Sequence, residues 1–345
     1  MPASRRLAAA LAMSALALTL AACGGGGEDP IATPEASSEA DPDAFPVTIE
    51  HKFGETEIAE PPERVVTVGY GEDDFALSLG VTPVGIREFI GEYAGAKRPW
   101  AKEELEAADP EEIGAEAINF EQVNRMNPDV ILGVYSLMTE RDYETLSKIA
   151  PTVAQTDEFI DGGVPWQDQL ALDAEALGRG EMAEELTTET EGTFADAREE
   201  HPEFEGKTAL LAAVDGDILY GYAPADPRAR FFTDLGFETD PEIEDLAGEE
   251  FYAEFGREQA DLYDQDVLVF LESATTQEEI ESDPVFQRLD AFKEGRVVFV
   301  DADDQFAGAL GFGSPLSLPY AIDGITPALE AAADGDPETE VPEVK

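Results

Sequence analysis

Residues 65–86 read VVTVGYGEDDFALSLGVTPVGI, and this stretch decides the fold class. Residues 65–68 form a short apolar run rich in β-branched side chains, residues 72–79 form a helical segment that Gly80 ends, and residues 84–86 return to an apolar strand. Short buried strands that alternate with helices are typical of a parallel α/β sheet. We therefore expect an α/β lobe around this stretch.

The same alternation continues through the first half of the chain and restarts in the second half. In the first half we expect a hairpin at 47–58, a helix at 119–126, a strand at 129–133 and a helix at 139–150, which begins with the capping-box pair Thr139 and Asp142. In the second half we expect strands at 208–214, 218–221, 266–271 and 296–300, and helices at 227–235, 284–293 and 315–333. Each half therefore predicts one α/β lobe.

A long polar segment separates the two predicted lobes. Residues 166–177 are helical in pattern, and residues 181–200 contain no Pro and only Gly192 as an interruption. A long helix that is polar on most sides bridges domains rather than filling a core. We predict two Rossmann-like parallel-sheet lobes joined by this one helix, with a ligand cleft between them. The predicted divisions are a signal peptide at 1–22, an acidic tether at 23–45, an N-terminal lobe at 46–178, the bridging helix at 179–203, a C-terminal lobe at 204–333 and an acidic tail at 334–345.

The N-terminus has the pattern of an export signal. Arg5 and Arg6 precede an apolar run at residues 7–22, which is shorter than the roughly 20 residues that a membrane-spanning helix needs. The small residues before Cys23 resemble the lipobox of bacterial lipoproteins, whose cysteine is diacylated. They predict a lipid anchor at Cys23 on the extracytoplasmic side of the cell membrane. A plain secreted protein with a stray thiol is the alternative.

The composition excludes several classes of protein. The chain has 345 residues, 77 Asp and Glu against 21 Lys and Arg, a formal net charge of −56, one Cys and two His. One cysteine excludes a disulfide framework, two histidines exclude a His-rich metal site, and the charge argues against a nucleic acid partner. The 43% of hydrophobic residues is enough to build a core. The negative charges repel one another, and dissolved ions in a salty medium screen this repulsion. We therefore hypothesise that the high net charge reflects a halophilic or halotolerant source.

Four phrases connect this layout with a known family. They are PERVV at 62–66, DFALSLG at 74–80, NPDVI at 127–131 and SPLSLPYAI at 314–322. With these phrases in this order, and with the lipobox and the bridging helix, the chain resembles the iron-siderophore substrate-binding lipoproteins of ABC importers over residues 47–333. The resemblance implies a monomeric two-lobed clamp that delivers a ferric siderophore to a membrane permease and its ATPase.

The scarce cations gather in two loops at predicted strand ends, where open α/β sheets bind ligands. One loop is at residues 87–102, and the other, at 222–233, opens a helix that Asp226 caps. A helix N-terminus disfavours cations, so an anionic ligand nearby would explain the arginines of the second loop. Pairing with surface acids is the alternative. The predicted ligand-binding cations are Arg87, Lys97, Arg98, Arg228 and Arg230.

Aromatic side chains near the same strand ends could stack on a flat chelate. The predicted contacts are Tyr70, Trp100, Tyr135, Trp166, Tyr222 and Phe306, with core packing as the alternative for each. The resemblance also implies one acidic permease contact in each lobe. By position these contacts are Asp74 and Glu258, and the alternative is that both are ordinary surface acids.

The predicted function is capture of a ferric siderophore, as an anionic chelate, for an ABC importer. No catalytic residue and no cofactor is expected, because the chain lacks a Gly-x-Ser-x-Gly elbow and the siderophore itself holds the iron. The chain has no adjacent tyrosine pair for bare Fe(III), and bare zinc or manganese would call for histidines. Cobalamin, haem and a non-transport role as a sensor or scaffold lipoprotein stay open, as does the siderophore class, because a clamp specifies little about its cargo.

Overall fold

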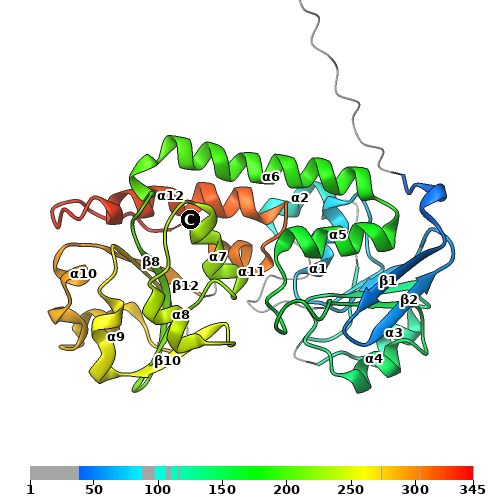
Figure 1. Ribbon diagram of the computed structural model, residues 1–345, viewed down its shortest axis with the longest axis horizontal. Coiled ribbons are helices and arrows are strands. Elements are labelled where there is room, and N and C mark those ends of the chain that lie inside the picture. Colours follow the sequence, from blue (N-terminus) through cyan, green and yellow to red (C-terminus); the bar gives the residue numbers. More distant parts are fainter. Residues whose placement is uncertain are drawn as a thin grey trace, which may run out of the picture. The chain divides into compact units, whose positions relative to one another are not determined.

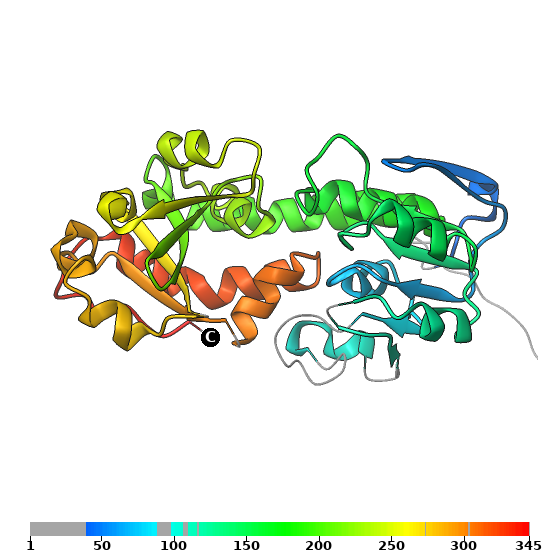
Figure 2. The same ribbon diagram turned by 90° about the horizontal axis from the view of Figure 1, so that it is seen from below.

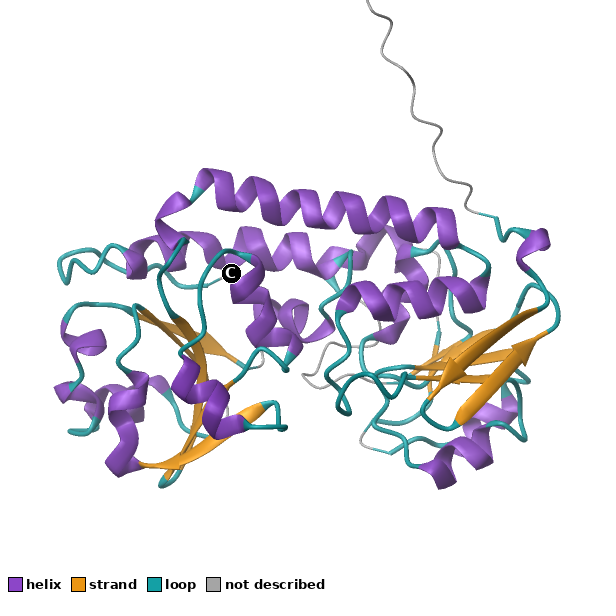
Figure 3. Cartoon of the chain, in the orientation of Figure 1, coloured by secondary structure: helices purple, strands orange, loops and turns teal. Residues whose placement is uncertain are grey.

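Two five-stranded sheets organise the described part of the chain. The computed structural model describes residues 39–87, 98–105, 110–115, 117–272, 274–302 and 304–344, which all belong to one unit at residues 36–345. Each sheet has its own set of helices around it, as Figure 1 and Figure 3 show. The predicted α/β class with two lobes is confirmed. Two predicted functional residues, Cys23 and Lys97, lie outside the described residues.

The N-terminal sheet is entirely parallel, with the strand order β5-β4-β3-β6-β7. Both central strands, β3 and β6, are buried at every position, which explains their continuous apolar pattern. The capping box of Thr139 and Asp142 starts helix α4 as expected. The strands of this lobe are β1 (Val47–His51), β2 (Gly54–Ile58), β3 (Val65–Thr67), β4 (Gly85–Ile86), β5 (Glu111–Glu112), β6 (Val130–Gly133) and β7 (Thr152–Ala154). Its helices are η1 (Pro42–Ala44), α1 (Glu72–Ser78), η2 (Pro99–Ala101), α2 (Lys102–Leu105), α3 (Phe120–Arg125) and α4 (Glu140–Leu146).

The C-terminal sheet is mixed, which corrects the expectation of a parallel sheet. Its order is β10-β9-β8-β11-β12, and β9 runs antiparallel to both β8 and β10. Only Gly216 and Asp217 connect β8 to β9, and two residues are too few for the crossover that parallel strands require. Gly216 has a φ of +59°, as two-residue hairpin turns demand. The strands are β8 (Ala209–Asp215), β9 (Ile218–Tyr222), β10 (Tyr252–Gly256), β11 (Val267–Glu272) and β12 (Val297–Asp301).

The helices of the C-terminal lobe follow the predicted pattern only in part. Helix α7 begins after Asp226 and Pro227 as predicted, whereas the helix expected at 284–293 is broken into the short elements η5 and α10. The full set is η3 (Pro202–Phe204), α7 (Pro227–Asp234), α8 (Pro241–Ala247), η4 (Arg257–Tyr263), α9 (Gln277–Ser282), η5 (Phe286–Arg288), α10 (Asp290–Lys293), α11 (Gln305–Phe312) and α12 (Ser317–Ala333).

Helix α6 (Gly180–Glu200) is the long helix that the sequence predicted between the lobes, and it follows α5 (Trp166–Leu177). It packs against α5 of the N-terminal lobe and against α12 and η3 of the C-terminal lobe. It is not the only link, however, because α12 also contacts η2 of the N-terminal lobe. Figure 2 shows α12 running alongside α6. The expected single helical connection is therefore reinforced by the elbow between α11 and α12.

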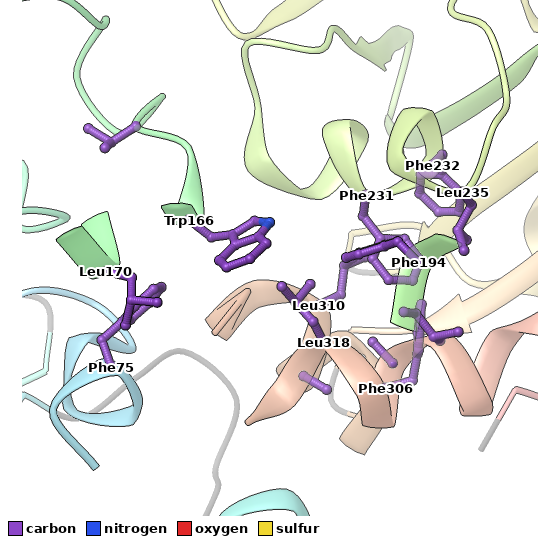
Figure 4. Close-up of a cluster of buried hydrophobic side chains, with 14 of the residues drawn as sticks. Phe75, Trp166, Leu170, Phe194, Phe231, Phe232, Leu235, Phe306, Leu310 and Leu318 are labelled. Atoms are coloured by element: carbon purple, nitrogen blue, oxygen red, sulfur yellow. The ribbon is translucent and has the colours of Figure 1, made fainter. Parts of the chain in front are cut away.

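One hydrophobic core extends through elements of both halves of the chain. Leu170 and Phe75 lie in the N-terminal part of this cluster, and Phe194, Phe231 and Leu310 lie in its C-terminal part (Figure 4). The acidic tail is anchored as well, because Val344 is buried in the same cluster.

Phe306 belongs to this core, which corrects its prediction as a ligand contact. It lies in α11, is 0% exposed, and its ring meets that of Phe231 edge to face with the ring centres 6.4 Å apart. Gly308 and Gly311 lie inside α11, and Gly313 ends it. Burial of its apolar residues outweighs the low helix propensity of these glycines.

Candidate ligand-binding site

Three neighbouring strands of the N-terminal sheet lead to the first half of the site. Tyr70 follows β3, Arg87 follows β4 and Tyr135 follows β6. Because these strands are parallel neighbours, their carboxyl ends meet at one edge of the sheet, where α/β proteins bind ligands. The Tyr70 N–H donates to the Tyr135 carbonyl over 2.8 Å, and the two ring centres lie 6.0 Å apart, edge to face. The structure thus brings together three side chains that the sequence singled out.

Arg87 is buried and held by neutral oxygen atoms. It is 4% exposed, its Nε donates to the Ala115 carbonyl over 2.8 Å, and its Nη1 donates to the carbonyls of Ser136 and Val68 over 3.0 and 3.3 Å. Its Nη2 donates to the Tyr70 hydroxyl over 2.5 Å, and its guanidinium carbon lies 3.8 Å from the centre of the Tyr70 ring. Burial lowers the pKa of Arg87, and Tyr70 opposes this shift. An arginine starts from so high a pKa that it stays charged near neutral pH.

A pocket of about 380 Å³ opens beside Arg87. Apolar and polar groups share its walls about equally, and the polar groups could orient a ligand. The lining residues are Tyr70, Arg87, Ala117, Ile118, Phe120, Ser136, Leu137, Met138 and Asp142. We call this the N-lobe pocket.

The C-terminal lobe carries a second pocket of about 330 Å³ around the end of β9. Tyr222 ends this strand, and its register partner on β10 is Tyr252. The lining residues are Ala213, Val214, Asp215, Tyr220, Tyr222, Arg228, Phe251, Tyr252 and Ala274. We call this the C-lobe pocket, and it includes two of the residues that the sequence predicted, Tyr222 and Arg228.

Arg228 stacks on Tyr222 as Arg87 stacks on Tyr70. Its guanidinium carbon lies 4.6 Å from the centre of the Tyr222 ring. It also forms a two-pronged ion pair with Asp226, from Nε to Oδ1 over 3.0 Å and from Nη2 to Oδ2 over 2.7 Å. Burial by itself disfavours this charge, but Asp226 raises the pKa of Arg228 above its ordinary value. Asp226 therefore both caps α7 and balances the arginine.

The two pockets are within electrostatic reach of each other. Burial raises the pKa of the Tyr135 hydroxyl, and the positive charge of Arg228 opposes that rise. Tyr135 belongs to the N-terminal lobe and Arg228 to the C-terminal lobe. A ligand that fills the space between them can therefore touch both lobes.

Arg230 bridges the lobes and lines neither of the two pockets, whereas the sequence predicted it as a ligand contact. Its Nη2 donates to the carbonyl of Gly163, just before α5, over 3.1 Å and to that of Ala225 over 3.5 Å. Its Nη1 is buried and donates to no acceptor among the described residues. A Cβ built on Gly163 would lie 3.1 Å from the Ala225 carbonyl, so the two loops pass each other closely.

Arg98, Trp100 and Asp74 form a second contact between the lobes. The Nη2 of Arg98 lies 2.7 Å from Asp73 Oδ2 and 2.5 Å from Asp74 Oδ1. Trp100 Nε1 donates to Asp74 Oδ2 over 2.6 Å, and the hydroxyl of Ser314, at the elbow between α11 and α12, donates to the same oxygen over 3.1 Å. Burial raises the pKa of Asp74 to about 6, although Arg98 opposes the shift.

This cluster corrects two predictions. Asp74 is 0% exposed, so its carboxylate is inside the protein and cannot contact a permease in this conformation. Arg98 is also buried, and its charge is balanced by two carboxylates instead of being offered to a ligand. Trp100 packs at this contact beside Phe312 and Tyr320. Two predicted residues lie outside this cluster. Trp166, predicted to contact the ligand, is buried at the start of α5. Glu258, predicted to contact the permease, is exposed in η4.

Several pocket residues escaped the sequence analysis. Tyr220 and Tyr222 alternate on one face of β9, and this period of two was a usable signal. Tyr252 joins them through pairing between β9 and β10, which the sequence did not reveal. Asp142 was seen only as a helix cap, yet it also lines the N-lobe pocket.

These observations define a class, and comparison with known proteins agrees. Residues 65–303 match the family described as periplasmic binding protein, and the chain belongs to that family. It is therefore a binding component of a transport system and not an enzyme. Within the described ranges, no group of three or more His, Cys, Asp or Glu side chains is placed to hold a metal ion.

The similar proteins narrow the class. The chain is 26% identical over 269 residues to the Fe(3+)-citrate-binding protein YfmC of Bacillus subtilis, covering 74% of this chain and 78% of YfmC. It is 25% identical over 271 residues to YhfQ of the same organism, a putative ABC transporter substrate-binding lipoprotein, covering 74% and 81%. The crystal structure of Streptococcus pneumoniae PiaA in complex with ferrichrome has a TM-score of 0.75 at 30% identity, covering 84% of this chain and 99% of PiaA. The chain is a substrate-binding protein of the iron-siderophore ABC transporter type.

Two observations bear on how the protein is related to the membrane. Relatives such as YhfQ are named as lipoproteins. Among the residues that the structure describes, none of the helices is both long enough and apolar enough to cross a bilayer.

Proposed function

We propose that this protein captures an anionic ferric siderophore between the N-lobe and C-lobe pockets and delivers it to the permease of an ABC importer. The observation that carries the proposal is the pair of arginine–tyrosine stacks, one in each lobe. Arg87 covers Tyr70 and Arg228 covers Tyr222, each at the end of a strand. Relatives that are named for ferric citrate and ferric anguibactin, and the PiaA complex with ferrichrome, support a ferric chelate as cargo.

The electrostatics favour an anionic chelate over a neutral one. Carbonyl oxygens and the Tyr70 phenol orient the buried guanidinium of Arg87, and the protein as a whole carries a formal net charge of −56. A buried cation in such a chain is a strong point of attraction for an anion. Guanidinium groups also suit the paired oxygen atoms of carboxylates and catecholates better than an ammonium group does. Arg228 contributes less net charge because Asp226 accompanies it.

The proposal extends to the anchor and to the permease. Lipidation at Cys23 would hold the protein on the extracytoplasmic side of the cell membrane, with residues 24–45 as a tether. Glu258 is exposed on the C-terminal lobe and is the proposed permease contact on that side. Replacing Cys23 with Ala should release the protein from the membrane fraction, and retention there would contradict the lipid anchor.

The proposal is tested by titrating the protein with a panel of chelates. The panel contains ferric citrate, a ferric tris-catecholate, ferrichrome, haem and cobalamin, and native mass spectrometry followed by calorimetry reports binding. We expect anionic ferric chelates to bind in preference to the others. Preferred binding of haem or cobalamin would replace the proposed cargo, and no binding of any member would favour a sensor or scaffold role.

Substitutions then test the electrostatic argument. Arg87→Ala should weaken binding of the anionic chelate by roughly 10- to 100-fold, since a hydrogen bond to a charged group contributes about 1.5–3 kcal/mol. Arg228→Ala should have a smaller effect, because Asp226 already balances that arginine. The control is Arg125→Ala, which removes a positive charge from an exposed ion pair of the same lobe. Equal affinities of Arg87→Ala and Arg125→Ala would refute the role of Arg87.

A further inference from the structure

A single buried carboxylate joins the two loops that carry Tyr70 and Tyr135. Glu72, the first residue of α1, is 0% exposed. Its Oε2 accepts the Gly69 N–H over 2.8 Å, and its Oε1 accepts the Val134 N–H over 2.6 Å. Gly69 immediately precedes Tyr70, and Val134 immediately precedes Tyr135. Each oxygen of Glu72 therefore holds the backbone of one loop that lines the N-lobe pocket, the first through Tyr70 and the second through Ser136.

The local sequence is shaped around this carboxylate. A Cβ built on Gly69 would lie 2.2 Å from Glu72 Oε2, so any larger residue at position 69 would collide with the carboxylate. The Tyr70 N–H in turn donates to the Tyr135 carbonyl, which completes a link between the two loops. Arg87 is tied to the same loops through the carbonyls of Val68 and Ser136. The geometry of the N-lobe pocket thus depends on one side chain beneath it.

A second buried carboxyl completes the arrangement. Asp173 of α5 is also 0% exposed, and its side chain contacts that of Glu72. Neither Asp173 oxygen accepts a hydrogen bond from a described group. Two carboxyls can share a hydrogen bond only when one is protonated, and both Glu72 oxygens already accept N–H groups. The proton therefore belongs on Asp173, which donates it to Glu72.

The charges around the pair favour keeping that proton. Burial is the main cause that raises the pKa of Glu72 to about 8, the two backbone N–H bonds oppose it, and the neighbouring Asp73 of α1 adds to it. Burial and the charge of Glu72 raise the pKa of Asp173. Arg87, after β4, lies within electrostatic reach of Glu72, while the charge of Arg98, before η2, is balanced by Asp73 and Asp74.

We propose that Glu72 is a positioning residue for ligand binding, which sets the spacing of the two loops that supply Tyr70 and Ser136 to the N-lobe pocket, and that Asp173 supports it by supplying the proton that the two carboxyls share. This inference depends on the proposed function for its effect on ligand affinity, because those loops matter to binding only if the ligand occupies this pocket. Its effect on the loops themselves needs no ligand. The two parts can therefore fail separately.

The test compares Glu72→Gln with Asp129→Asn as the control. Asp129 also accepts two backbone N–H bonds, from Glu63 and Arg64 over 2.8 Å each, but it precedes β6 at the opposite end of the same sheet. In the ligand-free protein, hydrogen exchange at residues 69–71 and 134–136 should speed up in Glu72→Gln and stay at the wild-type rate in Asp129→Asn. Unchanged exchange in Glu72→Gln would overturn the inference, whatever the protein binds.

Binding measurements give the second readout. With ferric citrate and ferrichrome as probes, Glu72→Gln should lower the affinity about tenfold, because the amide nitrogen cannot accept one of the two N–H bonds. Wild-type affinity in that variant would overturn the inference, whereas failure of the wild-type protein to bind either probe would count against the proposed function alone.

Asp173→Asn keeps the inference testable if Glu72→Gln does not fold. The asparagine amide can donate to Glu72 at any pH, so this variant should keep wild-type exchange at residues 69–71 and 134–136 near neutral pH. As the pH rises through the raised pKa of Asp173, the wild-type pair loses its shared proton, and exchange of these residues should speed up in the wild type but not in Asp173→Asn. Identical pH profiles for the two proteins would overturn the inference.

Discussion

Asp173→Asn should remove a pH-dependent term from the stability of the protein. In the folded state, burial and the charge of Glu72 raise the pKa of Asp173 well above its ordinary value, so Asp173 keeps the proton that it donates to Glu72. In the unfolded chain both carboxyls are exposed and ionised at neutral pH. The folded protein thus binds one more proton through Asp173 than the unfolded chain, from above the ordinary pKa of an aspartate up to the raised pKa of Asp173. The variant, in contrast, has an amide that needs no proton at this position.

The size and the sign of the effect follow from proton linkage. Because the folded state holds the extra proton, the free energy of unfolding falls by about 1.4 kcal/mol for each pH unit in this range. This stability is fully present below the ordinary carboxyl pKa and is lost as the pH rises toward the raised pKa of Asp173. Between pH 5.5 and pH 7.5 the wild type should therefore lose about 3 kcal/mol through this pair, and Asp173→Asn should not.

Urea unfolding followed by circular dichroism at pH 5.5, 6.5 and 7.5 measures this difference. Molar salt should be present throughout, since it screens the many surface carboxylates that also titrate. Asp129→Asn controls for the loss of one carboxylate from the same lobe and should follow the wild type. If the difference in unfolding free energy between Asp173→Asn and the wild type stays constant across the three pH values, the shared proton does not exist and the reasoning is refuted.

Three further predictions concern stability. Phe306→Ala should lower the free energy of unfolding by about 3–5 kcal/mol, because Phe306 is fully buried in the core. Urea unfolding measures this loss, and a loss below about 1 kcal/mol would mean that the residue is not part of that core. Thr139→Ala should cost about 1 kcal/mol by removing the capping box of α4, and no change would contradict its role as a cap. The melting temperature of the wild type should rise between low and molar salt as the net charge of −56 is screened, and a flat response would refute the saline hypothesis.

The sequence was sufficient for the elements that depend on local patterns. The apolar runs at β3 and β6 predicted buried parallel strands, Thr139 and Asp142 predicted the start of α4, and Asp226 with Pro227 predicted the start of α7. Each of these signals lies within a few residues of the structure that it specifies. The mixed C-terminal sheet was missed although its cause, a two-residue connection, is also local.

The site was predictable only where position along a strand decides it. Tyr70 and Arg87 follow neighbouring strands and line the N-lobe pocket, and Tyr222 and Arg228 flank the end of β9 and line the C-lobe pocket, whereas Tyr135 follows β6 and lines neither. Their contact with a ligand stays a prediction. Arg98 and Asp74 were placed wrongly, because they neutralise each other across a contact that Ser314 completes from residues far along the chain. No sequence pattern near position 74 or 98 predicts that contact.

The sequence by itself determined the α/β class, the division into two lobes and the strand ends at which cations and aromatic side chains gather. These properties follow from hydrophobic periodicity and turn chemistry, which act over a few residues. Only the tertiary structure decided which groups surround each charged side chain. Arg87 faces carbonyl oxygens while Arg98 faces two carboxylates, and Glu72 lies under the pocket beside Asp173. Whether a charged group is balanced depends on partners brought within a few ångströms by folding, because the strength of an ionic interaction depends on distance and burial.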